Sequence, residues 1–389
     1  MKATITINPN ILQWLKNNIS SFPSKNTTVF LENCDNGEKH TLNQIMKISS
    51  EMQIPFGYFF LKTPPIEENH LLEYRTTGSI KPEKASRNLI DTISQMEKIQ
   101  DWMHDYLISE NFDKIECVGS LKNETNIIYI AKTIKQKLNL SDNWLSEQKK
   151  QSEGFNKLKK AINNLGILVM TNGIVGSNTK RVLDINEFRA FTMIDSYAPL
   201  IFINNRDSQN GKLFSLTHEL IHIFLGKDSL YNIKKDNISL ISKTETLCNA
   251  VAAEILLPQH LFIKAWKLID NDTNFKISSI ATKYRCSSIV VARKALENNF
   301  INNHEYQQIT EECIKKYYEQ KEKEKKDKEP SPIYYPTMAA RIDHSFFMAL
   351  FTSVQEGKTL YSDAFRLTNT NRVTFNKLNE KILESSLER

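Results

Sequence analysis

The chain has 389 residues, of which 40% are hydrophobic and 25% are charged, and its formal net charge is +6. These values are ordinary for a globular protein, and the length suggests roughly two to four domains. A positive charge this small, much of it in local lysine clusters, does not by itself indicate a nucleic-acid-binding protein. No apolar run approaches the roughly 18 residues that a membrane span needs, so contact with a membrane is not expected.

The cysteines and the N-terminal segment favour a cytoplasmic protein. The five cysteines are scattered without a C-x-x-C pair, which favours reduced thiols over disulfides or a cysteine zinc site. No N-terminal segment combines a basic start, an apolar core and a cleavage site of small residues, so a secretory signal is not expected.

Residues 1–154 are predicted to be mainly helical. Residues 1–62 are expected to form a helical domain, because "ILQWLKNNI" and "TLNQIMKISSEMQI" place apolar side chains at helical spacing. Pro64 and Pro65 interrupt this pattern and indicate a boundary. Residues 63–154 are expected to form a helical linker or subdomain, with a long amphipathic helix over residues 88–110.

The pattern changes within residues 155–272, which we expect to form the core of the protein. Gly166 precedes the apolar run "ILVM", as expected for a buried strand, and "EFRAFTMID" and "APLIFINN" predict an antiparallel hairpin. The "EFRAF" strand is expected to expose an edge to which a peptide could add as a further strand. Two helices are expected next, "FSLTHELIHIFLG" and "TETLCNAVAAEILLP".

The remaining residues are again predicted to be helical. Residues 273–320 are expected to form a helical subdomain similar to a helix-turn-helix, with two short helices around a turn before residue 300. Residues 321–389 are expected to form a charged linker and a C-terminal helical unit. The lysine-rich "YYEQKEKEKKDKEPSP" is interpreted as a solvated helix end and linker rather than a binding patch.

The pattern H-E-x-x-H in "FSLTHELIHIFLG" indicates a metal site. His218 and His222 are four residues apart, so a helix presents both on one face, where both can bind one ion. Glu219 lies beside them, where a carboxylate can take a proton from water on the metal as a catalytic base. The simpler alternative is a core helix with two satisfied histidines, but the spacing favours the metal site.

A zinc site of this kind needs a third protein ligand, and the next predicted helix offers Glu245 and Glu254. They are nine residues apart and fall on opposite faces of one helix, so both cannot bind the metal. Glu245 is favoured, because Asn249 shares its face and could support a ligand histidine from behind. Glu254 is the alternative ligand, or a solvent-facing charge. One Zn²⁺ per chain is expected, although manganese or iron also suits these ligands.

The sequence "EFRAFTMIDSYAPLIFINNRDSQNGKLFSLTHELIHIFLG" followed by "ETLCNAVAAEILLP" resembles the ImmA/IrrE metallo-endopeptidases of bacteria and their mobile elements. The resemblance covers about residues 155 to 300, and "IPFGYFFLKTPP" and "EGKTLYSDAFRLTNT" resemble the flanks of the long form. It implies an α+β fold with a gluzincin-like zinc peptidase core, a small sheet containing antiparallel strands beside the H-E-x-x-H helix, flanked by mainly helical N- and C-terminal domains. It also implies an N-terminal domain similar to a Cro/repressor helix-turn-helix, here degenerate over residues 1–62.

The resemblance implies that the protein cleaves a regulatory protein, a repressor or an antitoxin-type protein, in a mobile-element or toxin–antitoxin system. One alternative is a non-catalytic antitoxin or regulator that binds a toxin through its helical flanks. A second alternative is a DNA-binding repressor. DNA reading is disfavoured, because the residues between "ILQWLKNN" and "GEKHT" are too few for two short helices and offer no convincing recognition helix.

Overall fold

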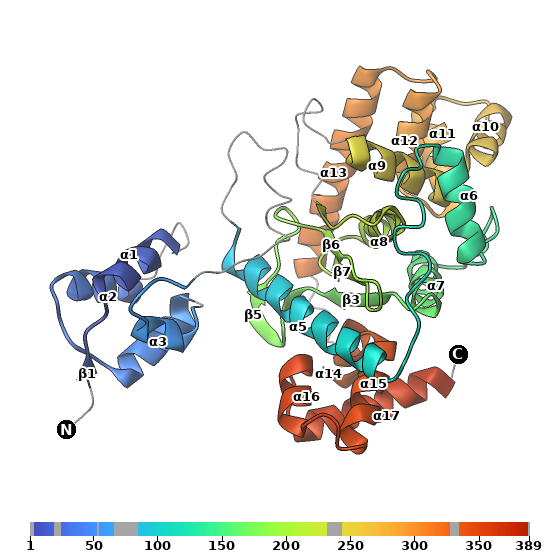
Figure 1. The fold of residues 1–389 in the computed structure, drawn as a ribbon. Coiled ribbons are helices and arrows are strands. Elements are labelled where there is room, and N and C mark those ends of the chain that lie inside the picture. The colour runs from blue at the N-terminus through green and yellow to red at the C-terminus, as the bar shows by residue number, and fades with distance from the viewer. Residues whose placement is uncertain are drawn as a thin grey trace. The chain divides into compact units, whose positions relative to one another are not determined.

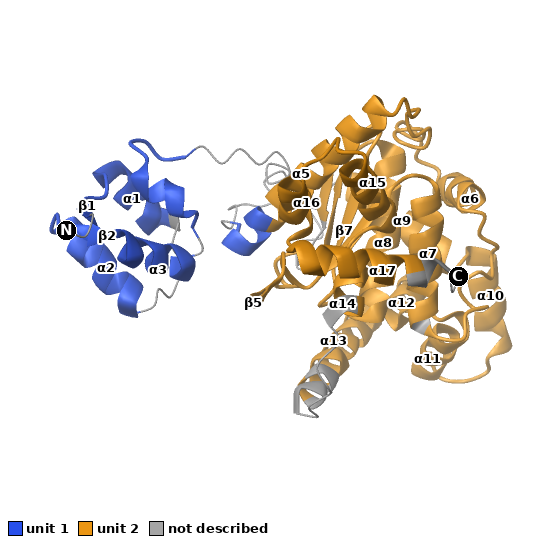
Figure 2. Cartoon of the chain, turned by 90° about the horizontal axis from the view of Figure 1, so that it is seen from below, with its two compact units in different colours: residues 1–70, 83–91 blue, residues 71–82, 92–389 orange. Residues whose placement is uncertain are grey.

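The computed structural model describes residues 4–18, 25–52, 54–65, 85–231, 243–326 and 334–387. The chain divides into two compact units, residues 1–70 with 83–91 and residues 71–82 with 92–389 (Figure 2). The described residues are mostly helical with small sheets, so the predicted α+β class is confirmed.

The first unit is helical with one short strand pair. Its elements are β1 Thr4–Ile5, α1 Pro9–Asn18, α2 Lys25–Asp35, β2 His40–Thr41, α3 Leu42–Met52 and the 3₁₀ helix η1 Phe56–Phe60. The two predicted helices correspond to α1 and α3. Helix α2 lies between them, in the segment that was considered too short for two helices. It forms because Phe30, Leu31 and Cys34 lie on one face at helical spacing and are buried in the core of this unit.

The second unit is built around a four-stranded mixed sheet (Figure 1). Its strands, in spatial order, are β3 Leu168–Asn172, β7 Leu200–Asn204, β6 Ala190–Met193 and β8 Ser229–Tyr231. Strands β3 and β7 are parallel, and the other pairs are antiparallel. The predicted hairpin is confirmed as β6 and β7, and the predicted buried strand as β3. A separate hairpin joins β4 Ile174–Val175 to β5 Asn178–Val182.

The expected exposed edge at "EFRAF" is wrong. This segment leads into β6, which is hydrogen-bonded to β7 on one side and β8 on the other. The sheet therefore ends at β3 and β8. The outer side of β3 is covered, because Val169 donates its backbone N–H to the buried carboxylate of Asp343 at 2.9 Å, and the hydroxyl of Thr171 donates to the carbonyl of Ala340 at 2.8 Å. Strand β8 was not among the predicted strands.

Helices cover both faces of this sheet. Helix α8 Gln209–Leu225 packs on the face toward which Thr192 points, and Phe191 and Phe202 stack on the opposite face at 5.0 Å between ring centroids. On that opposite face Phe202 lines a cavity together with Met96 of α5 and Phe346 of α15. The other helices are α5 Arg87–Ser109, which begins in the first unit, α6 Ile127–Lys137, α7 Gln151–Asn164, α9 Lys243–Leu256, α10 Gln259–Leu268, α11 Thr273–Tyr284, α12 Ser288–Glu297, α13 Asn303–Lys326, α14 Tyr334–Arg341, α15 His344–Gln355, α16 Tyr361–Thr368 and α17 Arg372–Leu387.

Several predicted elements are confirmed within this unit. The long helix expected over residues 88–110 is α5, and the two short helices expected around a turn are α11 and α12. The linker expected after α13 lies partly outside the described residues. No described helix is by itself long and apolar enough to cross a membrane. Helices α9 and α10 meet that criterion only as a pair, and the chain bends by 61° between them.

Gly226 ends helix α8 and fixes the position of its last turn. Its φ of 65° is left-handed, and a Cβ at this position would lie 3.0 Å from the Cα of Gly119, on a loop that donates backbone N–H groups to the carbonyls of Ile223 and Phe224. A side chain here therefore meets both backbone strain and a close contact.

We expect Gly226→Ala to destabilise the second unit by about 2–3 kcal/mol, measured by urea or thermal unfolding. Gly357→Ala is the matched control. Gly357 has a φ of 72°, but a Cβ added there would have no atom within 4 Å, so its cost should be only about 1 kcal/mol. Equal losses in the two variants would mean that the approach to Gly119 contributes nothing.

Candidate metal centre

Helix α8 carries the two histidines and the glutamate of the H-E-x-x-H pattern. The helix begins where the side chain of Ser208 accepts a hydrogen bond from the backbone N–H of Gly211 at 2.9 Å. From Leu213 onward nearly every residue is buried, because the helix lies between the sheet, α7 and α9. His218 and Glu219 are fully buried and His222 is 1% exposed.

Helix α9 brings a carboxylate to these histidines. Glu245 Oε2 lies 3.1 Å from His218 Nε2, and Glu245 Oε1 lies 3.2 Å from His222 Nε2. The two Nε2 atoms lie 3.2 Å from each other. Among the described residues, these three form the one group of histidine, cysteine or carboxylate side chains close enough to hold a metal ion together.

The donor set and its spacing fit a tetrahedral zinc ion. Bonds of about 2.0–2.1 Å to nitrogen or oxygen place the corners of a tetrahedron about 3.3 Å apart, close to the separations found here. Two imidazoles and one carboxylate leave a fourth corner free, as in catalytic zinc sites. His218, His222 and Glu245 therefore could bind zinc with little rearrangement.

The electrostatics of the three side chains show how closely they are coupled. Burial opposes the charged form of Glu245, but hydrogen bonds from His218 and His222 hold the pKa of Glu245 far below its ordinary value. Burial likewise lowers the pKa of His222, but the Cys248 thiol, Glu245 and the charge of Glu219 together raise that pKa well above its ordinary value. The site thus concentrates negative charge where a cation would bind.

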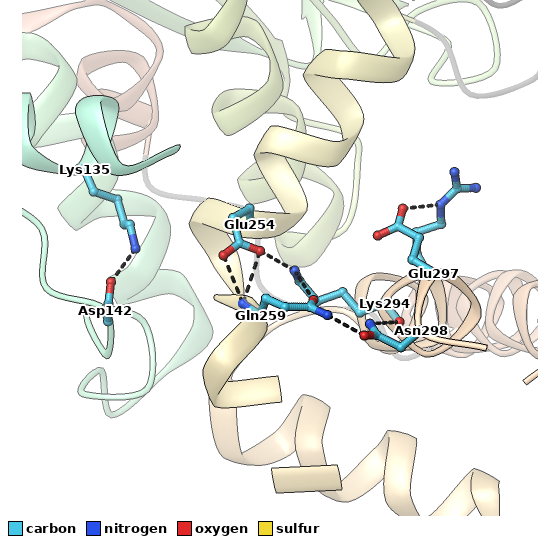
Figure 3. Close-up of polar contacts among 8 residues, drawn as sticks. Lys135, Asp142, Glu254, Gln259, Lys294, Glu297 and Asn298 are labelled. Carbon is cyan, nitrogen blue, oxygen red and sulfur yellow. Dashed lines mark hydrogen bonds and ion pairs between the residues drawn. The ribbon is translucent and has the colours of Figure 1, made fainter. Parts of the chain in front are cut away.

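Glu254, the alternative ligand, lies away from this centre. Its carboxylate accepts a hydrogen bond from Lys294 Nζ of α12 at 2.6 Å and two from the backbone N–H of Gln259 at 3.0 and 3.1 Å (Figure 3). Glu254 is only 9% exposed, so the expectation of a solvent-facing charge is also wrong. The side chain instead joins α9, the start of α10 and α12 through a buried ion pair.

Asn249 does not make the contact expected of it. Its side chain is half-buried, and no hydrogen bond joins it to a histidine or to any other part of the described chain. Cys248, one residue earlier, is fully buried and lies beside His222. A difference of one residue rotates a side chain by about 100° around the helix, which places the thiol rather than the amide against the ligand.

Glu219 is held from the sheet by two hydroxyl groups that the sequence did not reveal. Thr192 of β6 donates a hydrogen bond to Glu219 Oε2 at 2.6 Å, and Ser229 of β8 donates a short hydrogen bond to the same oxygen. Glu219 Oε1 is buried and has no hydrogen-bond partner in the described part of the chain. Thr192 is the one polar residue within the otherwise apolar strand "AFTM", which was an available signal, whereas Ser229 lies in a strand with no recognisable pattern.

Two other histidines and an arginine form ion pairs of their own. Arg189 forms an ion pair with Asp207 at 2.7 Å just before α8, and His104 binds Asp195 at 2.9 Å. His260 is exposed and lies 3.4 Å from Asp142. None of these residues belongs to the group around His218 and His222 among the residues that the structure describes.

A buried helix with two histidines and a glutamate, packed on a small sheet and completed by a glutamate from the next helix, has the architecture of a metallopeptidase domain. Residues 162–296 match the family model described as IrrE N-terminal-like domain, from the M78 peptidases. The chain therefore contains an IrrE N-terminal-like domain of the ImmA/IrrE family over these residues. Residues 342–381 match a domain of unknown function, DUF8813. Searches of the curated proteins and of the solved structures give no match.

Proposed function

We propose that the protein is a zinc-dependent, gluzincin-like endopeptidase that cleaves a regulatory protein. The observation that carries the proposal is the convergence of His218, His222 and Glu245 at 3.1–3.2 Å, with Glu219 buried beside them. The match of residues 162–296 to a peptidase family supports the same class of reaction.

In the proposed reaction, three side chains bind the metal and a fourth transfers protons. His218, His222 and Glu245 would hold the ion, which when bound supplies an activated water and polarises the carbonyl of the scissile peptide bond. Glu219 takes the proton of the attacking water at its free oxygen, Oε1, and gives a proton to the leaving amine. Thr192 and Ser229 bind the other oxygen of Glu219.

The substrate is proposed to be a repressor or an antitoxin-type protein, by resemblance to the ImmA/IrrE family. The side chain of Glu245 is 31% exposed, whereas those of the histidines are almost fully buried, so the site is reached from the side of Glu245. We propose that an extended segment of the substrate reaches the site from this side. Strand β8, as a sheet end that no other described strand pairs, could take such a segment as a further strand.

The rival proposal is a non-catalytic regulator that binds a toxin through its helical flanks. The mainly helical regions outside residues 162–296 support it, because more than half of the chain lies outside the peptidase-like domain. Both proposals share the metal site and a cytoplasmic location. They differ in whether Glu219 is required for biological output.

DNA reading receives little support from the helix pair α11 and α12. A recognition helix must present polar and basic side chains to base edges. Half of the residues of α12 are buried, including Lys294, which is paired with Glu254. The exposed Arg293 is paired with Glu297 at 2.9 Å. This helix therefore offers few groups that DNA could contact.

The proposal is tested by removing and restoring the metal. We expect the zinc-loaded protein to cleave members of an unbiased peptide mixture, with products read by mass spectrometry. Treatment with a chelator should lower the rate by more than about a hundredfold, because the ion contributes several kcal/mol to the reaction. Added zinc should restore it. Cleavage that persists in zinc-free protein, or that never occurs with one zinc bound per chain, would contradict the peptidase proposal.

A further inference from the structure

Both hydrogen bonds from the sheet to Glu219 end on the same carboxylate oxygen. Thr192 and Ser229 each donate to Oε2, and Oε1 receives none from any described residue. All three residues are buried, with exposed fractions of 0% for Thr192, 3% for Ser229 and 0% for Glu219. Water therefore does not compete for these contacts in the folded chain.

The register of the sheet creates this arrangement. Thr192 of β6 lies directly opposite Ser229 of β8 in an antiparallel pair. Opposed residues in such a pair project their side chains from the same face, so the two hydroxyl groups emerge side by side toward α8. A shift of one residue in β8 would place Leu230 opposite Thr192 and turn the Ser229 hydroxyl to the other face. The contact with Glu219 thus depends on β8 as well as on α8.

The hydrogen bonds to Oε2 leave Oε1 as the oxygen of Glu219 that can accept a proton. A serine or threonine hydroxyl has one proton to donate. Ser229 gives its proton to Oε2, and the 2.6 Å contact of Thr192 with Oε2 is much shorter than its 3.2 Å contact with the backbone carbonyl of Glu219. Both protons are therefore used on Oε2. A proton acceptor needs a free lone pair at a fixed position, and Oε1 is the oxygen that meets this condition.

We propose that Thr192 and Ser229 are positioning residues for Glu219, which hold its carboxylate by one oxygen so that the other stays free to accept a proton. The inference rests on the proposed peptidase function, in which Glu219 is the base. It assigns to the edge strand β8 a part in catalysis that the H-E-x-x-H pattern does not contain. The simpler possibility is that the hydroxyls only satisfy a buried carboxylate and have no effect on the reaction.

The first test compares turnover in zinc-loaded variants on the best peptide found for the wild type. Thr192→Val and Ser229→Ala should each lower kcat about tenfold, and the double variant about a hundredfold, with KM and zinc content unchanged. Thr192→Ser should restore most of the rate, because it keeps the hydroxyl. Thr217→Val is the matched control. Thr217 is fully buried on α8, but its hydroxyl donates to the carbonyl of Leu213 at 2.9 Å, so its kcat should not change.

The second test does not depend on activity. The infrared difference spectrum between metal-free wild type and metal-free Glu219→Gln isolates the carboxylate bands of Glu219. Two donors on one oxygen make the two C–O bonds unequal, which widens the separation between the antisymmetric and symmetric stretching bands. The same difference spectrum recorded in the Thr192→Val/Ser229→Ala background should show a narrower separation.

The outcomes separate this inference from the proposed function. Unchanged kcat in folded, zinc-loaded variants, with only a lower unfolding temperature, would overturn the positioning role. An unchanged infrared separation would overturn the asymmetric binding of the carboxylate itself. A wild type that cleaves no peptide would refute the proposed function, and the infrared result would then still decide whether the two hydroxyls hold Glu219 by one oxygen.

Discussion

Replacing Glu219 by glutamine should lower the rate of peptide cleavage by about 10²–10⁴-fold and leave zinc binding intact. The amide has the shape of the carboxylate, and its oxygen can still accept hydrogen bonds from Thr192 and Ser229. Its NH₂ group then occupies the position of Oε1 and cannot take up a proton. The metal ligands His218 and His222 are unaffected, since Glu219 is not among the three converging side chains.

The measurement pairs kcat with zinc content for the wild type, Glu219→Gln and an amide control. Glu311→Gln, on the exposed surface of α13, serves as that control and should behave as the wild type. Loss of both zinc and activity in Glu219→Gln would mean that the residue holds the metal and is misassigned as the base. Full biological output from Glu219→Gln in the cell would favour the rival proposal, a regulator that binds its partner without turnover.

The parts of the site that follow from spacing along one helix could be predicted from the sequence. His218 and His222 share a face because they are four residues apart. Glu245 and Glu254 lie on opposite faces because nine residues of helix correspond to about two and a half turns. These relations hold whatever surrounds the helix. The strands β6 and β7 were also predictable, because both segments are rich in apolar residues and a short connection containing Pro199 separates them.

The parts that depend on packing between distant segments could not be predicted. The rotation of α9 about its own axis, which brings Cys248 rather than Asn249 to His222, is set by the helices that pack against it. Strand β8 has three residues in a polar stretch and exists because β6 offers a free edge. The hydroxyl of Ser229 reaches Glu219 only through that pairing. Glu254 can be buried because it pairs with Lys294, which is forty residues away in the sequence. Nothing in the sequence indicates that pairing.

Replacing Glu245 by alanine should weaken zinc binding by more than about a hundredfold. Losing a residue that only hydrogen-bonds to a metal ligand already lowers metal affinity about 10–100-fold, and losing a ligand itself should cost more. The two remaining donors, His218 and His222, cannot hold the ion in a fixed geometry by themselves. Zinc content of the purified protein, with affinity measured by competition with a chelator, gives the result. The same change at Glu254 should leave zinc in place, since its carboxylate binds Lys294 and Gln259 instead.

The comparison needs a control for stability, because Glu254→Ala leaves the charge of Lys294 buried without its partner. The Lys294 side chain is 3% exposed, and breaking a buried pair on one side costs about 3–5 kcal/mol. A partly unfolded protein would lose zinc for that reason alone. The double variant Glu254→Met/Lys294→Met removes both charges and fills the space with apolar atoms, a replacement that is often neutral. This variant should keep one zinc per chain, whereas Glu245→Ala should fold and lose it. Zinc lost from the double variant but retained by Glu245→Ala would make Glu254 the ligand and refute the site.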